Sequence, residues 1–177
     1  MMAKALLNFV LFQASWFAAV LGGAHGWPWT GSLVAVLAVR VHLVMFEGNR
    51  KREVQLVAFI VLLGLVVESL LMQSGVIVYR SPEPVAVFPP VWILAMWLAF
   101  GTLPNGVLGW LHGRLWLAAV FGAVSGPLTY QAGAALGAAQ VSENMIGALG
   151  FIGLVWALAF PLILRVAAVS KQQSEAI

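Results

Sequence analysis

Six long apolar stretches follow one another along the chain, separated by short polar connections. An α-helix needs roughly 20 apolar residues to cross the hydrocarbon core of a bilayer, and each stretch is close to that length. The sequence therefore predicts one transmembrane domain, residues 1–177, folded as an all-α polytopic bundle. The expected spans are residues 5–23, 30–46, 53–72, 90–111, 115–137 and 145–168.

Two segments at the margins of this pattern need an interpretation. The first apolar stretch is long, carries Asn8 and Gln13 and ends without a clean cleavage site, so it is expected to remain a helix and not to act as a signal peptide. The connection over 73–88 is the one expected to form a real loop, because Pro82 and Pro84 oppose helix there.

Composition supports a lipid environment. Hydrophobic residues make up 62% of the chain and charged residues only 8%, and the mean hydropathy is +0.98. A soluble domain has about a quarter of its residues charged, so too little polar surface remains here to cover a globule in water. The few basic residues cannot form a basic face, which excludes nucleic-acid binding. Cysteine is absent, which excludes disulfides and thiolate chemistry.

The distribution of Lys and Arg predicts the orientation in the membrane. With the N-terminus in the cytoplasm, one basic residue, Arg80, falls outside. The cytoplasmic side then receives all the other basic residues of the connections and termini, as the positive-inside rule requires. We therefore expect a multi-pass membrane protein with both termini cytoplasmic. The cytoplasmic set is Lys4, Arg50, Lys51, Arg52, Arg114, Arg165 and Lys171.

Small residues at four-residue spacing predict where helices approach closely, because close backbone contact drives helix association in lipid. Ala118, Gly122 and Gly126 form such a stripe in the fifth span, and Pro127 should kink that helix. The fifth span is therefore expected at the centre of the bundle. Further glycine faces would permit a homodimer.

A short motif occurs twice, once in each half of the chain. His25-Gly26-Trp27-Pro28-Trp29 and His112-Gly113-Arg114-Leu115-Trp116 share H-G-x-x-W, and each follows the first span of a three-span half. Halves of three spans would be related by inversion, as in many transporters. Three matched residues raise this possibility without establishing it.

Two charged residues are expected at membrane depth, where a charge costs about 2.5–3.5 kcal/mol and marks a functional candidate. Arg40 lies within the second span and Glu68 in the outer half of the third. Because consecutive spans should be antiparallel neighbours, we predict an Arg40–Glu68 pair, direct or through water. The alternative is an ion pair that only fixes helix register.

Further polar residues near the middle of the fourth and fifth spans predict a shared polar cavity. Pro104 and Pro127 loosen the two helices at these positions, and broken helices with polar residues often line cavities. The histidines are secondary candidates, because a lone histidine is more often structural than catalytic. The cavity candidates are Arg40, Glu68, Asn105, Thr129, Tyr130 and Gln131, and the secondary ones are His25, His42 and His112.

The sequence names no reaction. It lacks the ligand spacing of a metal site and the G-x-S-x-G of a serine hydrolase, so neither a metal nor another cofactor is expected. Glu68 with Tyr130 or a histidine could perform acid–base work on a lipid, and the same Glu68 could be the protonation site of a carrier. The residues do not choose between these roles, although the missing motifs favour a protein that is not an enzyme.

Several stretches resemble a known bacterial family, domain of unknown function 2878. They are Asn8-Phe9, Trp16-Phe17-Ala18, the segment from His25 to Trp29, Gly109-Trp110-Leu111-His112-Gly113-Arg114 and Gly126-Pro127-Leu128-Thr129-Tyr130-Gln131-Ala132-Gly133. The resemblance implies a small inner-membrane protein without established catalytic residues. Its members tend to be encoded near cyclopropane-fatty-acid-synthase-like methyltransferases and flavin oxidoreductases, which implies a link to fatty-acyl modification or envelope stress. Leu103-Pro104-Asn105-Gly106 departs from the family's pattern, so a role for Asn105 does not follow from it.

Three functions remain open. The leading hypothesis is a membrane-embedded accessory or lipid-handling protein that works beside a lipid-modifying enzyme, with membrane lipid as its ligand. The second is a small secondary transporter with Glu68 as its coupling residue. The third is an intramembrane enzyme acting on phospholipid or its acyl chains.

Overall fold

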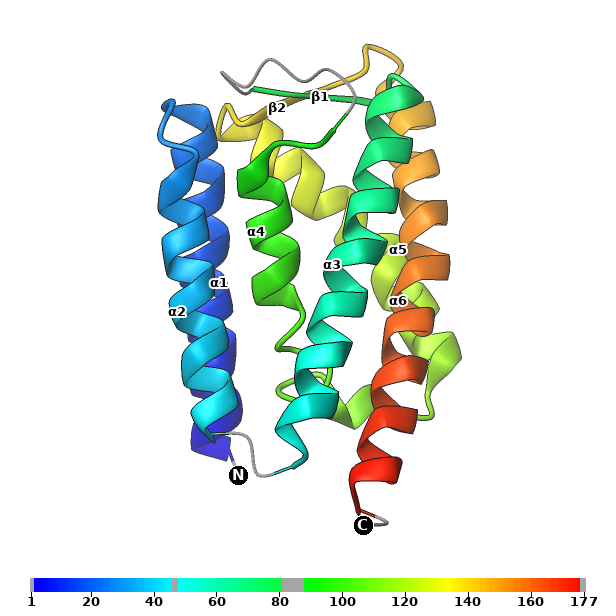
Figure 1. Cartoon of the computed structure of the whole chain (residues 1–177). Helices are drawn as coiled ribbons and strands as arrows, with labels where there is room; N and C mark the ends of the chain where they lie inside the picture. The colour runs from blue at the N-terminus through cyan, green and yellow to red at the C-terminus, as the bar shows by residue number, and fades with distance from the viewer. Residues whose placement is uncertain (1, 46–47, 81–87, 176–177) are drawn as a thin grey trace.

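The computed structural model describes residues 2–45, 48–80 and 88–175 as a bundle of helices closed at one end by a short two-stranded sheet (Figure 1). Both chain ends lie at the opposite end of the bundle. The elements are α1 (Met2–Ala24), α2 (Trp29–Met45), α3 (Arg50–Gln73), β1 (Ile77–Tyr79), α4 (Val91–Phe100), the 3-10 turn η1 (Gly109–Leu111), α5 (Leu115–Ala135), β2 (Ala139–Val141) and α6 (Met145–Glu175).

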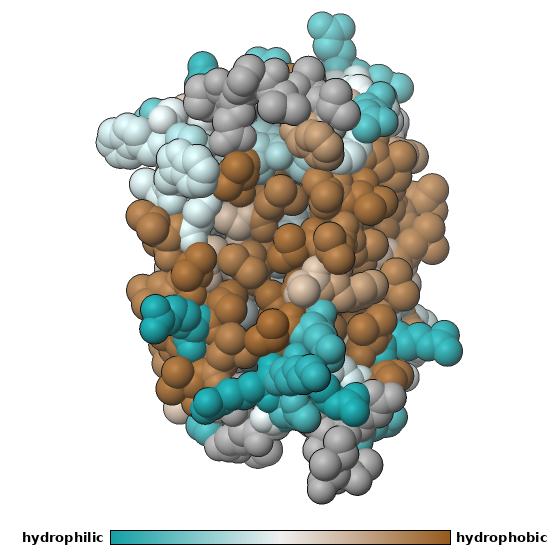
Figure 2. Space-filling view, in the orientation of Figure 1, coloured by the Kyte–Doolittle hydropathy of each residue, from teal (hydrophilic) through white to brown (hydrophobic). Residues whose placement is uncertain are grey.

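The outer surface is suited to lipid. Three of the described helices, α1, α3 and α6, are long and apolar enough to cross a membrane, and α2 and α4 are shorter apolar helices. Figure 2 shows a broad hydrophobic band around the middle of the visible face, with hydrophilic side chains gathered towards both ends. Large apolar side chains such as Leu33, Leu62 and Leu158 point outwards from three different helices. This surface is typical of a helical membrane protein.

The helices pack in an order that differs from their order in the chain. α1 and α2 pack on each other and on α4, α4 packs on α3, α3 on α6, and α6 on α5. The prediction that α5 lies at the centre is therefore wrong: α4 is central. The stripe of small residues on α5 serves a single interface, where Gly122 and Gly126 allow Trp156 of α6 to approach so closely that a methyl group would not fit.

The fourth apolar stretch does not form the expected helix over 90–111. α4 ends at Phe100, and turns follow until η1, so the helix has only ten residues. The backbone freed by the break is bonded by α1: the Asn8 side chain donates to Thr102 Oγ1 at 3.0 Å and accepts the Val107 N–H at 3.2 Å. Non-helical backbone at membrane depth requires such protein partners. We call residues 101–108 the α4 break.

The expectation of a purely α-helical chain also misses one element. β1 and β2 pair antiparallel, with Tyr79 opposite Ala139. Each strand follows a helix that ends in a glycine with positive φ, Gly75 at 72° and Gly137 at 84°, and this conformation favours glycine over other residues. This two-stranded sheet covers the end of the bundle farthest from the termini (Figure 1). The expected loop at Pro82 and Pro84 lies outside the described residues.

The repeated H-G-x-x-W motif marks two similar turns and not two similar halves. Gly26 and Gly113 both have positive φ, 81° and 77°, where the chain turns into the next helix. However, α1 packs along α2, whereas the corresponding helices α4 and α5 do not pack closely. The shared motif is accounted for by local turn geometry.

Candidate functional site

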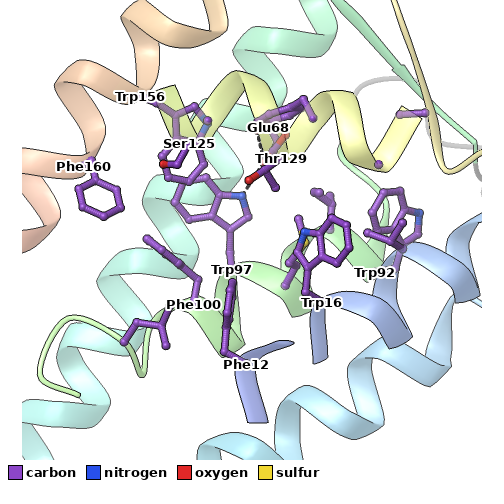
Figure 3. A pocket seen from close by; sticks show the side chains of 18 of the residues that line it. Phe12, Trp16, Glu68, Trp92, Trp97, Phe100, Ser125, Thr129, Trp156 and Phe160 are labelled. Carbon is purple, nitrogen blue, oxygen red and sulfur yellow. Dashed lines mark hydrogen bonds between the residues drawn. The ribbon is translucent and has the colours of Figure 1, made fainter. Parts of the chain in front are cut away.

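A cavity of about 210 Å³ lies among α1, α4, α5 and α6, below the two-stranded sheet. Its walls are almost entirely apolar and include four tryptophans, which Figure 3 shows arranged around it with Phe12, Phe100 and Phe160: Trp16, Trp92, Trp97 and Trp156. α1 and α5 form opposite walls but do not pack closely on each other. Their edge residues Phe9 and Phe121 are 44% and 46% exposed. The cavity is thus a groove that opens between exposed apolar side chains of α1 and α5, and we call it the aromatic groove.

Among the described residues, one carboxyl group, that of Glu68 on α3, reaches the aromatic groove. It is 1% exposed, and three neutral groups donate hydrogen bonds to it. Trp97 Nε1 and Tyr130 Oη donate to Oε1 at 2.6 and 2.7 Å, and Tyr79 Oη donates to Oε2. Burial first, and the nearby carboxyl second, raise the pKa of Tyr79 well above its ordinary value, so its phenol keeps the proton that it donates.

Arg40 does not pair with Glu68. It lies on an exposed face of α2, while α4 packs between α2 and the part of α3 that carries Glu68. The prediction assumed that helices adjacent in the chain are adjacent throughout their length, and the central position of α4 breaks that assumption. Near the end of α2 an Arg side chain can extend towards the headgroup region. Among the described residues, no Lys, Arg or His contacts the Glu68 carboxyl.

Polarity changes along the aromatic groove. The hydrogen-bonding side chains lie in the half near the two-stranded sheet, where Glu68, Tyr79 and Tyr130 meet. Thr129 and Ser125 follow along α5. The other half, towards the chain termini, is formed by apolar side chains only: Phe9, Phe12, Leu103, Val107, Leu108 and Phe121. A ligand that matches this groove has one polar end and a hydrophobic chain.

A second buried acid, Glu53 in the first turn of α3, forms a separate cluster at the end of the bundle near the termini. Its Oε1 lies 2.6 Å from His42 Nε2, and its Oε2 accepts from Asn105 Nδ2 at 2.6 Å. Glu53 is 1% exposed and His42 9%. Asn105 was expected beside Glu68, and the α4 break carries it to Glu53 instead. We call His42, Glu53 and Asn105 the Glu53 cluster; it links α2, α3 and the α4 break.

The other sequence candidates lie apart from these two clusters. Gln131 is exposed, and its amide contacts Met145 Sδ at 3.6 Å. His25 is exposed near the end of the bundle that carries the two-stranded sheet, and its Nδ1 lies 2.9 Å from the Leu21 carbonyl oxygen. His112 follows η1, and burial lowers its pKa, an effect partly offset by the Pro104 carbonyl. Its Nε2 has no hydrogen-bond partner among the described residues.

Three residues of these clusters were not singled out from the sequence. Tyr79 lies in the connection over 73–88, Trp97 is one of eight tryptophans, and Glu53 stands at a helix start where acids are common. No periodicity distinguishes any of them. Within the described ranges, no group of three or more His or Glu side chains is placed to hold a metal ion.

Chemically, the Glu68 carboxyl with two phenols and an indole can hold a proton or receive a hydrogen-bond donor, but it includes no nucleophile beside a base. Neither a curated protein nor a solved structure shows significant similarity to the chain. The sequence profile described as Protein of unknown function (DUF2878) matches residues 5–162, nearly the whole chain and all the residues that form the aromatic groove. The chain belongs to this family.

Proposed function

We propose that this chain is a lipid-handling protein of the bacterial inner membrane that binds the hydrophobic chain of a membrane lipid in the aromatic groove. The observation that carries the proposal is a groove that opens between exposed apolar side chains of α1 and α5, apolar along most of its length and polar at one end. In this role the protein presents or holds a lipid for a lipid-modifying enzyme.

Selective binding of a chain from lipid requires more than apolar walls, because the bilayer is itself apolar. The groove offers two further contributions. Its aromatic rings form a fixed surface against which a chain packs by dispersion, and Trp97 is held in place by stacking on Trp156 with ring centroids 5.1 Å apart. The polar groups around Glu68 fix the position of one end of the ligand.

The proposed topology has six spans with both termini in the cytoplasm. It is supported by the basic residues Arg50, Lys51 and Lys171 at the end of the bundle where the termini lie, while Arg80 is at the end with the two-stranded sheet. A fluorescent-protein fusion at the C-terminus should be bright and an alkaline phosphatase fusion there inactive. The reverse pattern would contradict the orientation.

Filling the groove tests the proposed function directly. Gly133 of α5 lines the aromatic groove, is buried, and has open space where a side chain would begin, so Gly133→Leu occupies the groove without disturbing the backbone. Gly150 of α6 also has open space but lies outside the groove and is exposed, so Gly150→Leu is the matched control.

Native mass spectrometry of protein released from membranes measures the retained lipid. We expect wild type and Gly150→Leu to carry a bound lipid and Gly133→Leu to lose it. Equal retention by all three proteins would place the lipid elsewhere and contradict the proposal. Co-purification of a lipid-modifying enzyme would support the accessory role, whereas lipid turnover by the purified protein alone would support an intramembrane enzyme.

A second candidate function, a proton-coupled carrier, is favoured by one observation: the Glu68 carboxyl lies at membrane depth with neutral partners only. A carrier would show substrate flux in proteoliposomes that depends on a proton gradient and disappears in Glu68→Gln. Absence of flux for hydrophobic and amphiphilic substrates would leave the lipid-handling role as the better account.

A further inference from the structure

The polar end of the aromatic groove is an acceptor. A carboxylate offers about four lone-pair sites and no donor, and three of these sites receive hydrogen bonds from Tyr79, Trp97 and Tyr130. One site remains for a ligand. The three donors are already committed to Glu68, so they offer little to a ligand whose polar end accepts hydrogen bonds; the donors left in the described lining include the hydroxyls of Ser125 and Thr129 and Nε1 of Trp156.

Charge sharpens this preference. Among the described residues no basic side chain contacts Glu68, and Arg80, which follows Tyr79, is exposed with its guanidinium near Gly137. When Glu68 is ionised, an anionic head at this depth would be repelled by the carboxylate, and a neutral one would leave its charge unbalanced. A cationic head would balance it.

The surrounding rings add to the same preference. Trp16, Trp92, Trp97 and Tyr130 line the groove around the end where Glu68 lies (Figure 3). The face of an aromatic ring carries negative potential and attracts a cation, most strongly when water is excluded. Trp97 and Tyr130 turn their polar edges to Glu68, and Trp97 is stacked on Trp156, so the carboxylate is the main attraction for an ammonium group and the rings add to it where the group reaches their faces.

We propose that the aromatic groove selects single-chain amphiphiles whose polar end is a protonated amine or a quaternary ammonium group. The head of the ligand lies below the two-stranded sheet beside Glu68, and its hydrocarbon chain extends along the apolar half of the groove towards Phe9 and Leu108. This inference rests on the proposed function, which supplies the hydrophobic chain, and adds the charge class of the head.

A proton and the cationic head compete for the same carboxylate. The titratable groups that face Glu68 are Tyr79 from β1 and Tyr130 from α5, and both donate their protons to it. As pH falls, protonation of Glu68 removes the charge that holds the cation. Affinity for a cationic amphiphile therefore falls with pH, while affinity for an uncharged amphiphile with the same chain does not.

Three hexadecyl probes test the inference on the full chain in lipid nanodiscs: hexadecyltrimethylammonium, hexadecanol and hexadecyl sulfate. Binding is followed by the tryptophan fluorescence of the groove, and Gly133→Leu, with the groove filled, supplies the background from partitioning into lipid. We expect the ammonium probe to bind roughly tenfold more tightly than the alcohol, and the sulfate more weakly than both. Glu68→Gln should bring the ammonium probe to within about twofold of the alcohol.

The outcomes separate the two proposals. If ammonium and alcohol probes bind equally and Gly133→Leu abolishes both, the groove binds chains but the charge selection is wrong. If none binds above the Gly133→Leu background, the proposed function fails as well. If Glu68→Gln fails to fold, the pH dependence of the ammonium probe on wild type decides the question: affinity that is unchanged from neutral to acidic pH overturns the inference.

Discussion

Replacing Asn8 by Ala should be among the most destabilising single changes outside the aromatic groove, because one amide supports the α4 break. Asn8 Nδ2 donates to Thr102 Oγ1 at 3.0 Å and approaches the Thr102 carbonyl at 3.4 Å, while Oδ1 accepts the Val107 N–H at 3.2 Å. Asn8 is 9% exposed. Alanine removes these contacts and leaves the Val107 N–H without its partner.

The magnitude follows from the two kinds of contact. Side-chain hydrogen bonds between membrane helices average about 0.6 kcal/mol in double-mutant cycles, so the contact with Thr102 contributes little by itself. The Val107 N–H, which is partly buried, weighs more, because a backbone donor left without a partner away from water costs about 1–3 kcal/mol and more in hydrocarbon. We expect Asn8→Ala to lower the free energy of unfolding by about 2–4 kcal/mol.

Ser15 provides the matched control on the same helix. It is buried like Asn8, but its hydroxyl donates to the Leu11 carbonyl of its own helix at 2.8 Å, so Ser15→Ala frees no donor elsewhere. Unfolding in mixed micelles with increasing SDS, followed by tryptophan fluorescence, compares the variants. A loss below about 1 kcal/mol for Ser15→Ala is expected. Equal losses for both would refute the argument that Asn8 holds the α4 break.

Three further predictions concern the surroundings of the two acids. Gly64→Ala should lower the free energy of unfolding by about 1–3 kcal/mol and disturb Trp97, whose ring occupies the position of the added methyl. Gly150→Ala, where space is open, should raise it by up to about 1 kcal/mol, and the same unfolding assay measures both. Glu53→Leu should lower the free energy of unfolding by about 3 kcal/mol, and adding His42→Leu should lower it little further. If the loss in the double variant equals the sum of the two single losses, Glu53 and His42 are not coupled. Because burial lowers the pKa of His112 below its usual 6.5, the fold favours the neutral ring, so stability is retained above pH 6.5 and declines as pH falls below it. His112→Gln should remove about 1 kcal/mol or less of this decline, and an unchanged pH profile would contradict it.

Local hydropathy was sufficient to predict most of the helices, because the signal for a span lies within the span itself. Five of the six expected spans coincide with helices to within a few residues at most ends; α6 extends further, to Glu175. The fourth does not, since its course depends on a partner far away in the chain: Pro104 is visible in the sequence, but Asn8, which bonds the freed backbone, is 94 residues before Thr102. A sequence pattern carries no information on such a partner.

The site was predicted in part for the same reason. Glu68 and Tyr130, expected near one another from their depth, do meet, with 2.7 Å between Oη and Oε1. Depth is a property of position along a span and can be read from sequence. Which helix faces which is a property of packing, and here the prediction of an Arg40–Glu68 pair was wrong because α4 packs between α2 and α3.

The two buried acids of α3 illustrate how partners separate a structural role from a binding role. Glu53 has a histidine that can carry the opposite charge and an amide from the α4 break, so its cluster joins three segments and both carboxyl oxygens have a partner, although Oδ1 of Asn105 has none among the described residues. Glu68 is equally buried but receives only neutral donors, and it faces a groove instead of a packed interface. A charge held in that way remains unbalanced until a proton or a cation arrives. The α4 break connects the two acids, because the chain that leaves α4 at Phe100 provides Asn105 to Glu53 and leaves Leu103, Val107 and Leu108 as the apolar end of the groove above which Glu68 lies.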